Sequence, residues 1–421
     1  MSDPIIHAAS WLVNPDSPPI AGGALLVRDG AVADVGTLSE LRHAHSVPVV
    51  EYPDCAIIPG FVNAHTHLEL THFPSWRLRS AIDYHPRHFT EWIIQLIKII
   101  RGLTTDDYPP SVYEGMRMCL ESGTTAIGEI LTNPLLSSLY KESVLAGRLY
   151  FEVVGQGTTR FENKFEGAVS AATSHATGPM TTGLSPHTPY TIGERHLPRI
   201  REAVVSHRLP LAIHISESAA ETDFIFDSSG PLATDFYPFV GWERYLTSPR
   251  RCSSTELMDR NGLLTSATLA VHCVHLTLAD ARILKERGVS IALCPRSNER
   301  LDVGRAPVAL FKKLGIALAL GTDSLASNDS LSLWDEMRYA LDAFPHDLAP
   351  EDLFRMVTIG GASALGISAI CGSLDVGKRA DFQVVSNMGD GEGELLERLI
   401  QAGSLQDVYA GGERFIGRVM T

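Results

Sequence analysis

Cysteine is scarce in this sequence and scattered along it. The six cysteines among the 421 residues are Cys55, Cys119, Cys252, Cys273, Cys294 and Cys371. No two of them form a CxxC pair, and their spacing lacks the density of a disulfide scaffold. We therefore expect reduced thiols, as in a cytoplasmic protein.

Basic clusters and long apolar runs are also missing. The net charge is -14 at pH 7, and no run of lysine and arginine offers the basic face that nucleic-acid binding needs. No stretch approaches the roughly 18 uninterrupted apolar residues of a membrane span, and the N-terminal MSDPIIHAASWLVNPDSPP has no basic segment followed by an apolar one. We therefore expect a cytoplasmic protein with no nucleic-acid partner, no membrane span and no export. Its expected partner is a small-molecule substrate, and a homodimer is a possible assembly.

The composition is that of a globular protein with a large core. Hydrophobic residues make up 44% of the chain and charged residues 20%, which is enough for one large domain and a smaller one. Short apolar runs alternate with turns at both ends of the chain, in IIHAASWLV and ALLVRDGAVADVG, then in GSLDVGKRADFQVVS and LQDVYAGGERFIGRVMT. Such alternation predicts β-hairpins. We therefore predict a discontinuous β-sandwich domain from residues 1–57 and 372–421, with a second domain, 58–371, inserted between them.

The inserted segment alternates apolar strands with amphipathic helical stretches. Eight candidate strands read CAIIPGFVNAH, GTTAIGEI, RLYFEVV, TTGLSPH, LPLAIHI, ATLAVHC, VSIALCP and IALALGT. Two of the helical stretches, TLADARILKERG and APVALFKKLG, close on the glycine expected just past a helix C-terminus. Eight strand–helix units indicate an α/β fold of the (β/α)8 TIM barrel type. A doubly wound open sheet is the alternative, although no GxGxxG follows the first strand.

Polar side chains gather where these strands end, which is the face on which a TIM barrel carries its active site. The first strand runs into His65 and His67, whose side chains project the same way in an extended chain. Later strand ends carry His187 in SPHTPY, His214 and Glu217 in HISES, His272 in HCVHL and Asp323 in GTDSLASN. Singly, a strand-end histidine is usually a satisfied core residue, and a GTD turn is often a helix cap. Jointly they predict a metal site with acid–base groups beside it.

The motifs PGFVNAHTH, HISES, AVHCVHL and GTDSLASN, in this order, resemble those of the amidohydrolase superfamily, in its branch of hydrolytic deaminases and chlorohydrolases. The resemblance covers nearly the whole chain, since ADFQVV is similar to the closing strand of the family's terminal sandwich. It implies one divalent metal ion, Zn²⁺ or alternatively Fe²⁺, bound by His65, His67, His214 and Asp323. Two-metal members use a bridging lysine at the end of a middle strand, and the third and fourth candidate strands end without one.

The same resemblance assigns Glu217, His272 and Asp323 to catalysis. The metal would lower the pKa of its water from near 16 to about 7, and Asp323 and His272 would orient the resulting hydroxide toward an electron-poor ring carbon. Glu217 would protonate a ring nitrogen and then the departing amine, which requires that it not be a metal ligand. The implied reaction is hydrolytic deamination to an oxo heterocycle with release of ammonia. The other zinc deaminase design, with HxE and PCxxC, is absent from the sequence.

Two long loops are expected to shape the pocket. In the first, 72–102, FTEW resembles the nucleoside-binding segment of methylthioadenosine and S-adenosylhomocysteine deaminases, in which a glutamate grips the ribose hydroxyls; here this would be Glu91, unless Glu91 is simply solvated at a helix start. His187 matches a family histidine that reaches the substrate. The second loop, 228–249, is rich in aromatic residues, which would either seal a flat substrate or pack the loop itself.

Three arginines in the first loop, Arg77, Arg79 and Arg87, are candidates for binding a substrate carboxylate, because a guanidinium can hold that group through two hydrogen bonds. The alternative for each is a solvated surface charge.

The substrate expected first is an adenine nucleoside. HTHLELT together with HISESAAE, SSGPL and CPRSN is similar to the aminodeoxyfutalosine deaminase-like group, whose substrate carries a benzoate. The alternatives are an S-adenosylhomocysteine or methylthioadenosine deaminase, a guanine or pterin deaminase, and a triazine chlorohydrolase. A non-enzyme alternative is an inactive barrel that serves as a scaffold, which the filled metal and acid–base positions argue against.

Overall fold

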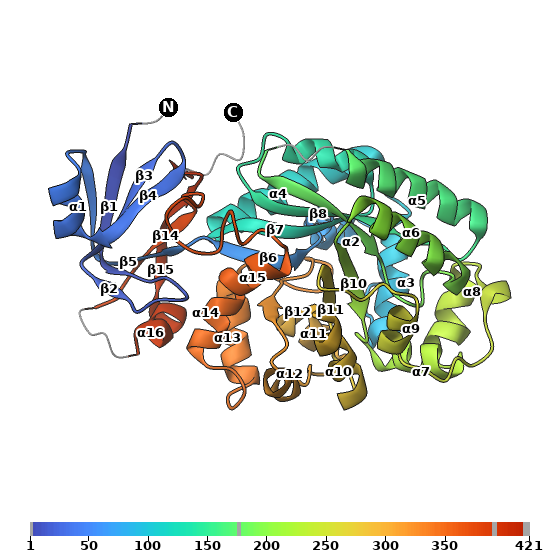
Figure 1. Ribbon diagram of the computed structural model, residues 1–421. Coiled ribbons are helices and arrows are strands. Elements are labelled where there is room, and N and C mark those ends of the chain that lie inside the picture. The colour runs from blue at the N-terminus through green and yellow to red at the C-terminus, as the bar shows by residue number, and fades with distance from the viewer. Residues whose placement is uncertain (1–2, 175–177, 390–393, 416–421) are drawn as a thin grey trace.

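The computed structural model describes residues 3–174, 178–389 and 394–415, which form a barrel and a separate sheet beside it (Figure 1). The barrel strands are β6 (Phe61–Thr66), β7 (Thr124–Leu131), β8 (Ala146–Val153), β9 (Met180–Pro186), β10 (Leu211–Ile215), β11 (Thr268–His272), β12 (Ser290–Leu293) and β13 (Leu318–Leu320). They pair in parallel and in chain order, and a parallel bridge between Thr66 and Asp323 joins the last strand's end to the first. The predicted (β/α)8 barrel is confirmed.

The second sheet is built from both ends of the chain. Its strands are β1 (Ile5–Leu12), β2 (Ile20–Ala21), β3 (Gly23–Arg28), β4 (Ala31–Thr37), β5 (Val49–Pro59), β14 (Phe382–Ser386), β15 (Ser404–Ala410) and β16 (Glu413–Arg414). Strand β5 joins the two ends, because it pairs in parallel with β1 and antiparallel with β14. The predicted union of the termini is confirmed, while the boundaries at 57/58 and 371/372 stay a prediction. Residues 416–421 of the last predicted segment lie outside the described residues.

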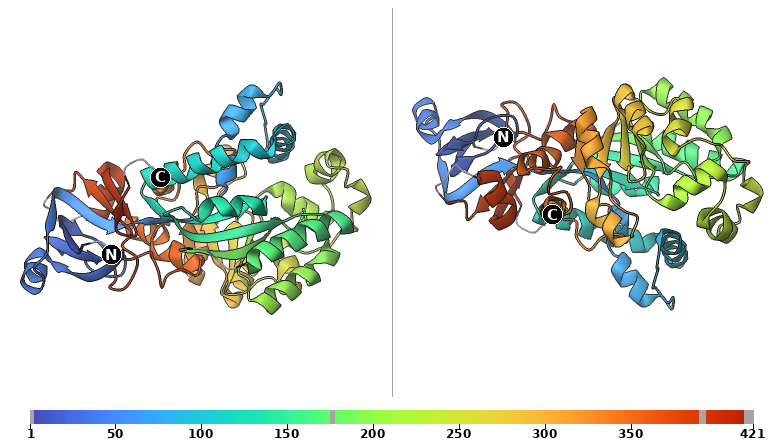
Figure 2. Two further views of the ribbon diagram at one scale, coloured as in Figure 1. Left: turned by 90° about the horizontal axis from the view of Figure 1, so that it is seen from above. Right: turned by 90° about the horizontal axis from the view of Figure 1, so that it is seen from below.

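Helices surround the barrel and cover its strand ends, while α1 (Leu38–Ala44) packs against the terminal sheet instead (Figures 1 and 2). The others are α2 (Phe73–Arg79), α3 (Phe89–Ile100), α4 (Tyr108–Glu121), α5 (Thr158–Thr173), α6 (Leu197–His207), α7 (Ala219–Asp227), α8 (Tyr237–Phe239), α9 (Ser254–Arg260), α10 (Leu278–Arg287), α11 (Pro295–Arg300), α12 (Val308–Leu314), α13 (Leu333–Ala343), α14 (Pro350–Met356), α15 (Ile359–Ala364) and α16 (Leu395–Ala402). The glycines predicted to follow α10 and α12, Gly288 and Gly315, do end them in the left-handed conformation. Within the ranges described, no helix combines the length and apolarity needed to cross a bilayer.

The segment 55–65 is expected to form one strand, but in the structure it is divided between two. The chain leaves the terminal sheet at Pro59 and enters the barrel at Phe61, and the break falls at Gly60. A Cβ on Gly60 would lie 2.2 Å from Thr125 Oγ1, so only glycine lets the chain pass this close to β7. The apolar run 55–65 is continuous, and so gives no sign that its two halves belong to different sheets.

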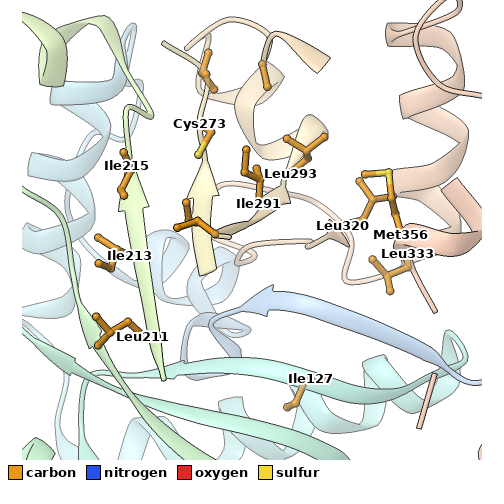
Figure 3. Close-up of a cluster of buried hydrophobic side chains, with 14 of the residues drawn as sticks. Ile127, Leu211, Ile213, Ile215, Cys273, Ile291, Leu293, Leu320, Leu333 and Met356 are labelled. Carbon is orange, nitrogen blue, oxygen red and sulfur yellow. The ribbon is translucent and has the colours of Figure 1, made fainter. Parts of the chain in front are cut away.

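In strand β10, alternate side chains face the surrounding helices and the barrel interior. Leu211, Ile213 and Ile215 belong to the large apolar cluster shared with the surrounding helices, and Figure 3 shows them ranged along the strand. Ala212 belongs instead to the cluster that fills the barrel interior. Because side chains alternate along a strand, His214 lies on the face of Ala212. This face ends at the candidate site.

Strands β7 and β8 approach each other so closely that one residue of β8 has to be glycine. Gly147 has a φ of +140°, and a Cβ on it would lie 1.9 Å from the carbonyl oxygen of Ile127. Gly147→Ala should therefore lower the free energy of unfolding by roughly 2 kcal/mol or more, measured by urea denaturation. Gly167→Ala in α5 is the matched control, because a Cβ there meets nothing within 4 Å. Equal stabilities of the two variants would contradict this account of the strand contact.

Candidate active site

Three histidines and one aspartate converge at the strand ends. His65 Nε2 lies 3.2 Å from His67 Nε2 and 3.2 Å from His214 Nε2. Asp323 Oδ1 lies 3.6 Å from both His65 Nε2 and His67 Nε2. Ligand atoms bound at about 2.1 Å around a tetrahedral ion are about 3.4 Å apart. The spacing of these four atoms therefore fits a single metal ion.

Hydrogen bonds outside the cluster orient two of these ligands. His214 Nδ1 donates to the carbonyl oxygen of His187 at 3.0 Å, which leaves the Nε2 lone pair directed at the cluster. Asp323 Oδ2 accepts from the hydroxyls of Ser297 at 2.7 Å and Ser327 at 2.6 Å, so that Oδ1 faces the histidines. Partners of this kind fix ligand orientation in metal sites.

The protonation states also suit metal binding. Burial is the main cause that lowers the pKa of His67 to about 3, and it likewise lowers the pKa of His214 well below its ordinary value. Burial would raise the pKa of Asp323, but contacts with His65 and His67 outweigh it and hold that pKa well below the usual range. Neutral imidazoles and an ionised carboxylate are the forms that bind metal. The donor set thus fits a divalent ion such as Zn²⁺ or Fe²⁺.

Four residues at these strand ends have left-handed backbones although none is glycine. The φ angles are 54° at Ser216, 69° at His272, 52° at Cys273 and 58° at Asp323. Such angles cost free energy and persist only where the surroundings impose them. At Asp323 the backbone N–H donates to His65 O and the carbonyl accepts from Thr66 Oγ1, both at 3.1 Å. The first and last strands thereby place the carboxylate beside the histidines.

A buried carboxyl and a buried imidazole face each other beside the cluster. Glu217 Oε1 lies 3.6 Å from His272 Nε2, and the two residues are 5% and 1% exposed. His272 Nδ1 donates to Asn298 Oδ1 at 2.9 Å, so the lone pair of Nε2 points toward Glu217. Burial, with Asp323 and Glu221 nearby, raises the pKa of Glu217 well above its ordinary value. A carboxyl that keeps its proton near neutral pH can act as a general acid.

The carboxyl of Glu217 is free for this role because a second glutamate holds its loop. Glu221 accepts hydrogen bonds from the backbone N–H groups of Ser216 at 2.8 Å and Glu217 at 3.1 Å, and from Ser254 Oγ at 2.5 Å. The loop after β10 is thereby fixed by Glu221, and Glu217 is left facing His272.

A cavity of about 360 Å³ opens beside the cluster, and His67, His214, Glu217, His272 and Asp323 line it. Helix α3 supplies one apolar wall, and the loop 228–249 supplies a second through Phe236, Val240 and Trp242. Both long loops expected to shape a pocket therefore do so. A pocket with apolar walls and a few converging polar groups is where a small molecule is expected to bind.

Of the two residues predicted to bind the substrate, one lines the cavity and the other does not. His187 lines the cavity, and its Nδ1 lies 3.1 Å from Thr191 Oγ1. Glu91 does not line it. As the third residue of α3, Glu91 accepts hydrogen bonds from the backbone N–H of Arg87 at 2.9 Å and from its guanidinium at 3.1 Å. This arrangement does not support the predicted ribose contact of Glu91.

The three arginines considered for a substrate carboxylate also lie outside the cavity. Arg79 is paired with Asp107 at 3.0 Å, Arg87 with Glu91 at 3.1 Å, and Arg77 stacks on the ring of Tyr84. The loop 72–102 faces the cavity through apolar residues of α3 and through one other arginine, Arg101.

Sequence reasoning missed four charged residues that line the cavity, namely Glu69, Glu152, Arg101 and Arg160. Glu69 follows His67 by two residues, and Glu152 stands near the end of β8, so the rule that located the other ligands could have found both acids. Burial is the main cause that raises the pKa of each carboxyl to about 7. Glu152 Oε1 lies 3.9 Å from His187 Nε2. The arginines reach the cavity through tertiary packing, and nothing in the local sequence predicts it.

Comparisons with known proteins agree with this geometry. Residues 56–413 match the Amidohydrolase family. The 5-methylthioadenosine/S-adenosylhomocysteine deaminase of Syntrophobacter fumaroxidans is 31% identical over 402 residues, which cover 90% of this chain and 84% of the relative. The aminodeoxyfutalosine deaminase of Deinococcus radiodurans is 28% identical over 361 residues, which cover 82% of this chain and 81% of the relative.

Solved structures share the fold. An adenosine deaminase from Xanthomonas campestris with bound zinc superposes with a TM-score of 0.82 at 26% identity, covering 99% of this chain and 94% of the other. The Helicobacter pylori aminofutalosine deaminase in complex with methylthio-coformycin gives a TM-score of 0.85 at 21% identity, covering 98% and 100%. The second likeness concerns the fold alone.

Proposed function

The chain belongs to the amidohydrolase family, and on that premise we propose that it is a metal-dependent hydrolase that deaminates an adenine nucleoside to its oxo product with release of ammonia. The observation that carries the proposal is the position of Glu217, whose carboxyl faces His272 Nε2 at 3.6 Å beside the histidine–aspartate cluster. A protein that only binds a metal would need the four residues of the histidine–aspartate cluster and no acid beside them. An acid whose pKa is raised, placed next to the cluster but not among its four converging atoms, indicates proton transfer as well.

His65, His67, His214 and Asp323 would hold the metal ion, for which we propose Zn²⁺, with Fe²⁺ as the alternative. When bound, a divalent ion supplies a water activated for attack at neutral pH. That supply of a nucleophile is what hydrolytic deamination requires.

The protein's own groups then have separate tasks. Glu217 donates a proton to the ring nitrogen next to the carbon that bears the amino group, which makes that carbon more electrophilic. It then takes up a proton released by the attacking water and passes it to the departing amine, which leaves as ammonia. His272 presents the Nε2 lone pair that its bond to Asn298 leaves free, and so can accept a hydrogen bond from the attacking water. Asp323 Oδ1 can accept a second one, since its other oxygen is occupied by two serines.

An adenine nucleoside is favoured over a free base by the shape and charge of the cavity. The apolar side chains of α3 and of the loop 228–249 suit a flat heterocycle, while Glu69 and Glu152 offer carboxylate oxygens to sugar hydroxyls. Among nucleosides we propose aminodeoxyfutalosine first, then methylthioadenosine and S-adenosylhomocysteine, in keeping with the named activities of the relatives. Guanine, pterins and chlorotriazines lack the sugar hydroxyls that these carboxylates would bind, and Glu152, unlike Glu69 with its bonds from Thr132, would then have no hydrogen-bond donor among the residues that the structure describes.

Substrate preference can be tested directly. We expect kcat/KM for the three nucleosides to exceed that for guanine and for a chlorotriazine by at least about 100-fold, because a site built to bind hydroxyls rejects ligands that lack them. Ammonia release measured across this panel gives the ratio. A preference for the free base or the triazine would overturn the nucleoside proposal while leaving the metal site intact.

Asn298 is expected to act through His272. Asn298→Ala removes the acceptor for Nδ1–H, so the imidazole can change tautomer or rotate, and kcat should fall roughly 10-fold to 100-fold with metal content unchanged. Asn261→Ala is the control, because that side chain only donates to Leu257 O at 2.8 Å in α9. Unchanged kcat in Asn298→Ala would show that this hydrogen bond does not set the orientation of His272.

A further inference from the structure

Two arginines that line the cavity, Arg101 and Arg160, have no acidic partner among the residues that the structure describes. Arg101, the residue that ends α3, lines the cavity, and its guanidinium carbon lies 4.7 Å from the centre of the Phe239 ring. Among the residues that the structure describes, no carboxylate lies within ion-pair distance of it, and no carbonyl accepts from it. Its charge is supported instead by the aromatic face and by the C-terminal end of α3, both of which favour a cation.

Two surface arginines near α3 do have acidic partners. Arg79 and Arg87 are each paired with an acid on the protein surface, so they have little charge to offer a ligand. Arg160 lies in α5, which follows β8, the strand that carries Glu152, whereas Arg101 lies at the C-terminal end of α3. The acids that line the cavity, Glu69, Glu152, Glu217 and Asp323, lie on β8 or on the segments that follow β6, β10 and β13.

This distribution of charge orients a ligand. An anionic group is repelled by the acids beside the metal cluster and attracted by Arg101, while an amino heterocycle suits the acids. We propose that Arg101 is a specificity-determining residue that binds a carboxylate carried by the substrate away from its amino heterocycle. This inference rests on the proposed deamination of an adenine nucleoside, and it selects nucleosides with an anionic tail within that class.

A carboxylate is the anion that the arrangement suits best. The Phe239 ring holds the guanidinium by its face, so the edge with its paired N–H donors stays available, and a planar carboxylate accepts two parallel hydrogen bonds from such an edge. Lysine could supply the charge but not the paired donors. The site thereby distinguishes a nucleoside with a benzoate-like end from a neutral one.

The experiment compares two substrates on four proteins. Aminodeoxyfutalosine carries a carboxylate and methylthioadenosine is neutral; the proteins are wild type, Arg101→Ala, Arg101→Lys and Lys98→Ala. Lys98 is the matched control, because its ammonium lies 5.7 Å from the centre of the same Phe239 ring but the residue lines a different hollow. Melting temperature and metal content are recorded for each protein, and Arg101→Lys keeps the test valid if the alanine variant is unstable.

We expect Arg101→Ala to raise KM for aminodeoxyfutalosine roughly 10-fold to 100-fold with kcat little changed, and to leave methylthioadenosine within about 2-fold. Arg101→Lys should recover part of the loss, and Lys98→Ala should match wild type. Equal effects on both substrates, or none, would overturn the assignment of Arg101. If wild type deaminates neither nucleoside, the proposed function fails; if it deaminates both and Arg101→Ala changes nothing, only this inference fails.

Discussion

His65→Ala is expected to remove the bound metal and to lower deaminase activity at least about 1,000-fold. The Nε2 atom of His65 is the centre of the cluster, 3.2 Å from each of two other imidazole nitrogens and 3.6 Å from Asp323 Oδ1. The side chain is fully buried, so no other ligand can replace it without rearrangement. A metal ion contributes several kcal/mol to such a reaction, and each 1.4 kcal/mol is a factor of about ten in rate.

The measurement is metal content per chain after dialysis, taken together with the rate of ammonia release. Asp323→Ala should give the same result. His196→Ala is the matched control, since His196 is also buried but stacks on Phe161 at 4.1 Å between ring centres, away from the cluster. Full metal retention in both cluster variants would refute the ligand assignment.

Glu217→Gln is expected to keep the metal and the fold and to lower kcat roughly 100-fold to 10,000-fold. The amide is close in size to the carboxyl but cannot donate and take back a proton at this position. Glu217 is not among the four atoms that converge on the metal position, and its loop is held by Glu221, so the substitution should leave both intact. Single-turnover kinetics with the metal-loaded variant would isolate the chemical step.

Glu91→Gln is the comparison for this experiment. Its carboxylate is occupied by Arg87 and does not line the cavity, so kcat/KM should stay within about 3-fold of wild type. Loss of metal in Glu217→Gln would mean that a ligand had been mistaken for an acid. A near-normal kcat in Glu217→Gln would exclude it as the proton donor.

The strand-end residues could be predicted from sequence because the order of the strands along the chain is also their order around a (β/α)8 barrel. His65 and His214 lie next to the last residue of an apolar strand and Asp323 follows one. The carboxyl ends of parallel strands meet on one face of a barrel whatever the detail of the helices. The same rule applied to every strand would also have found Glu152. What it could not reveal is that the run 55–65 belongs to two sheets, because the break depends on the contact of Gly60 with Thr125.

The substrate side of the cavity was harder to predict for a physical reason. FTEW places Glu91 beside Trp92, but neighbouring residues on a helix point in different directions, and only Trp92 faces the cavity. Arg101 lies at the far end of the same helix and reaches the cavity because α3 packs beside the loop 228–249, where Phe239 receives the guanidinium. This contact joins two segments that are more than a hundred residues apart in the sequence. The hydrophobic periodicity of neither segment predicts it.

The most direct test of the proposed reaction is a product balance on wild-type protein that holds one equivalent of divalent metal per chain. Aminodeoxyfutalosine and methylthioadenosine are supplied separately, and ammonia and the nucleoside product are both quantified. The account predicts one ammonia and one oxo nucleoside for each nucleoside consumed, with the glycosidic bond intact and with the rate falling roughly 100-fold to 10,000-fold in Glu217→Gln at equal metal content. Unchanged nucleosides in the presence of fully metal-loaded wild-type protein would contradict it.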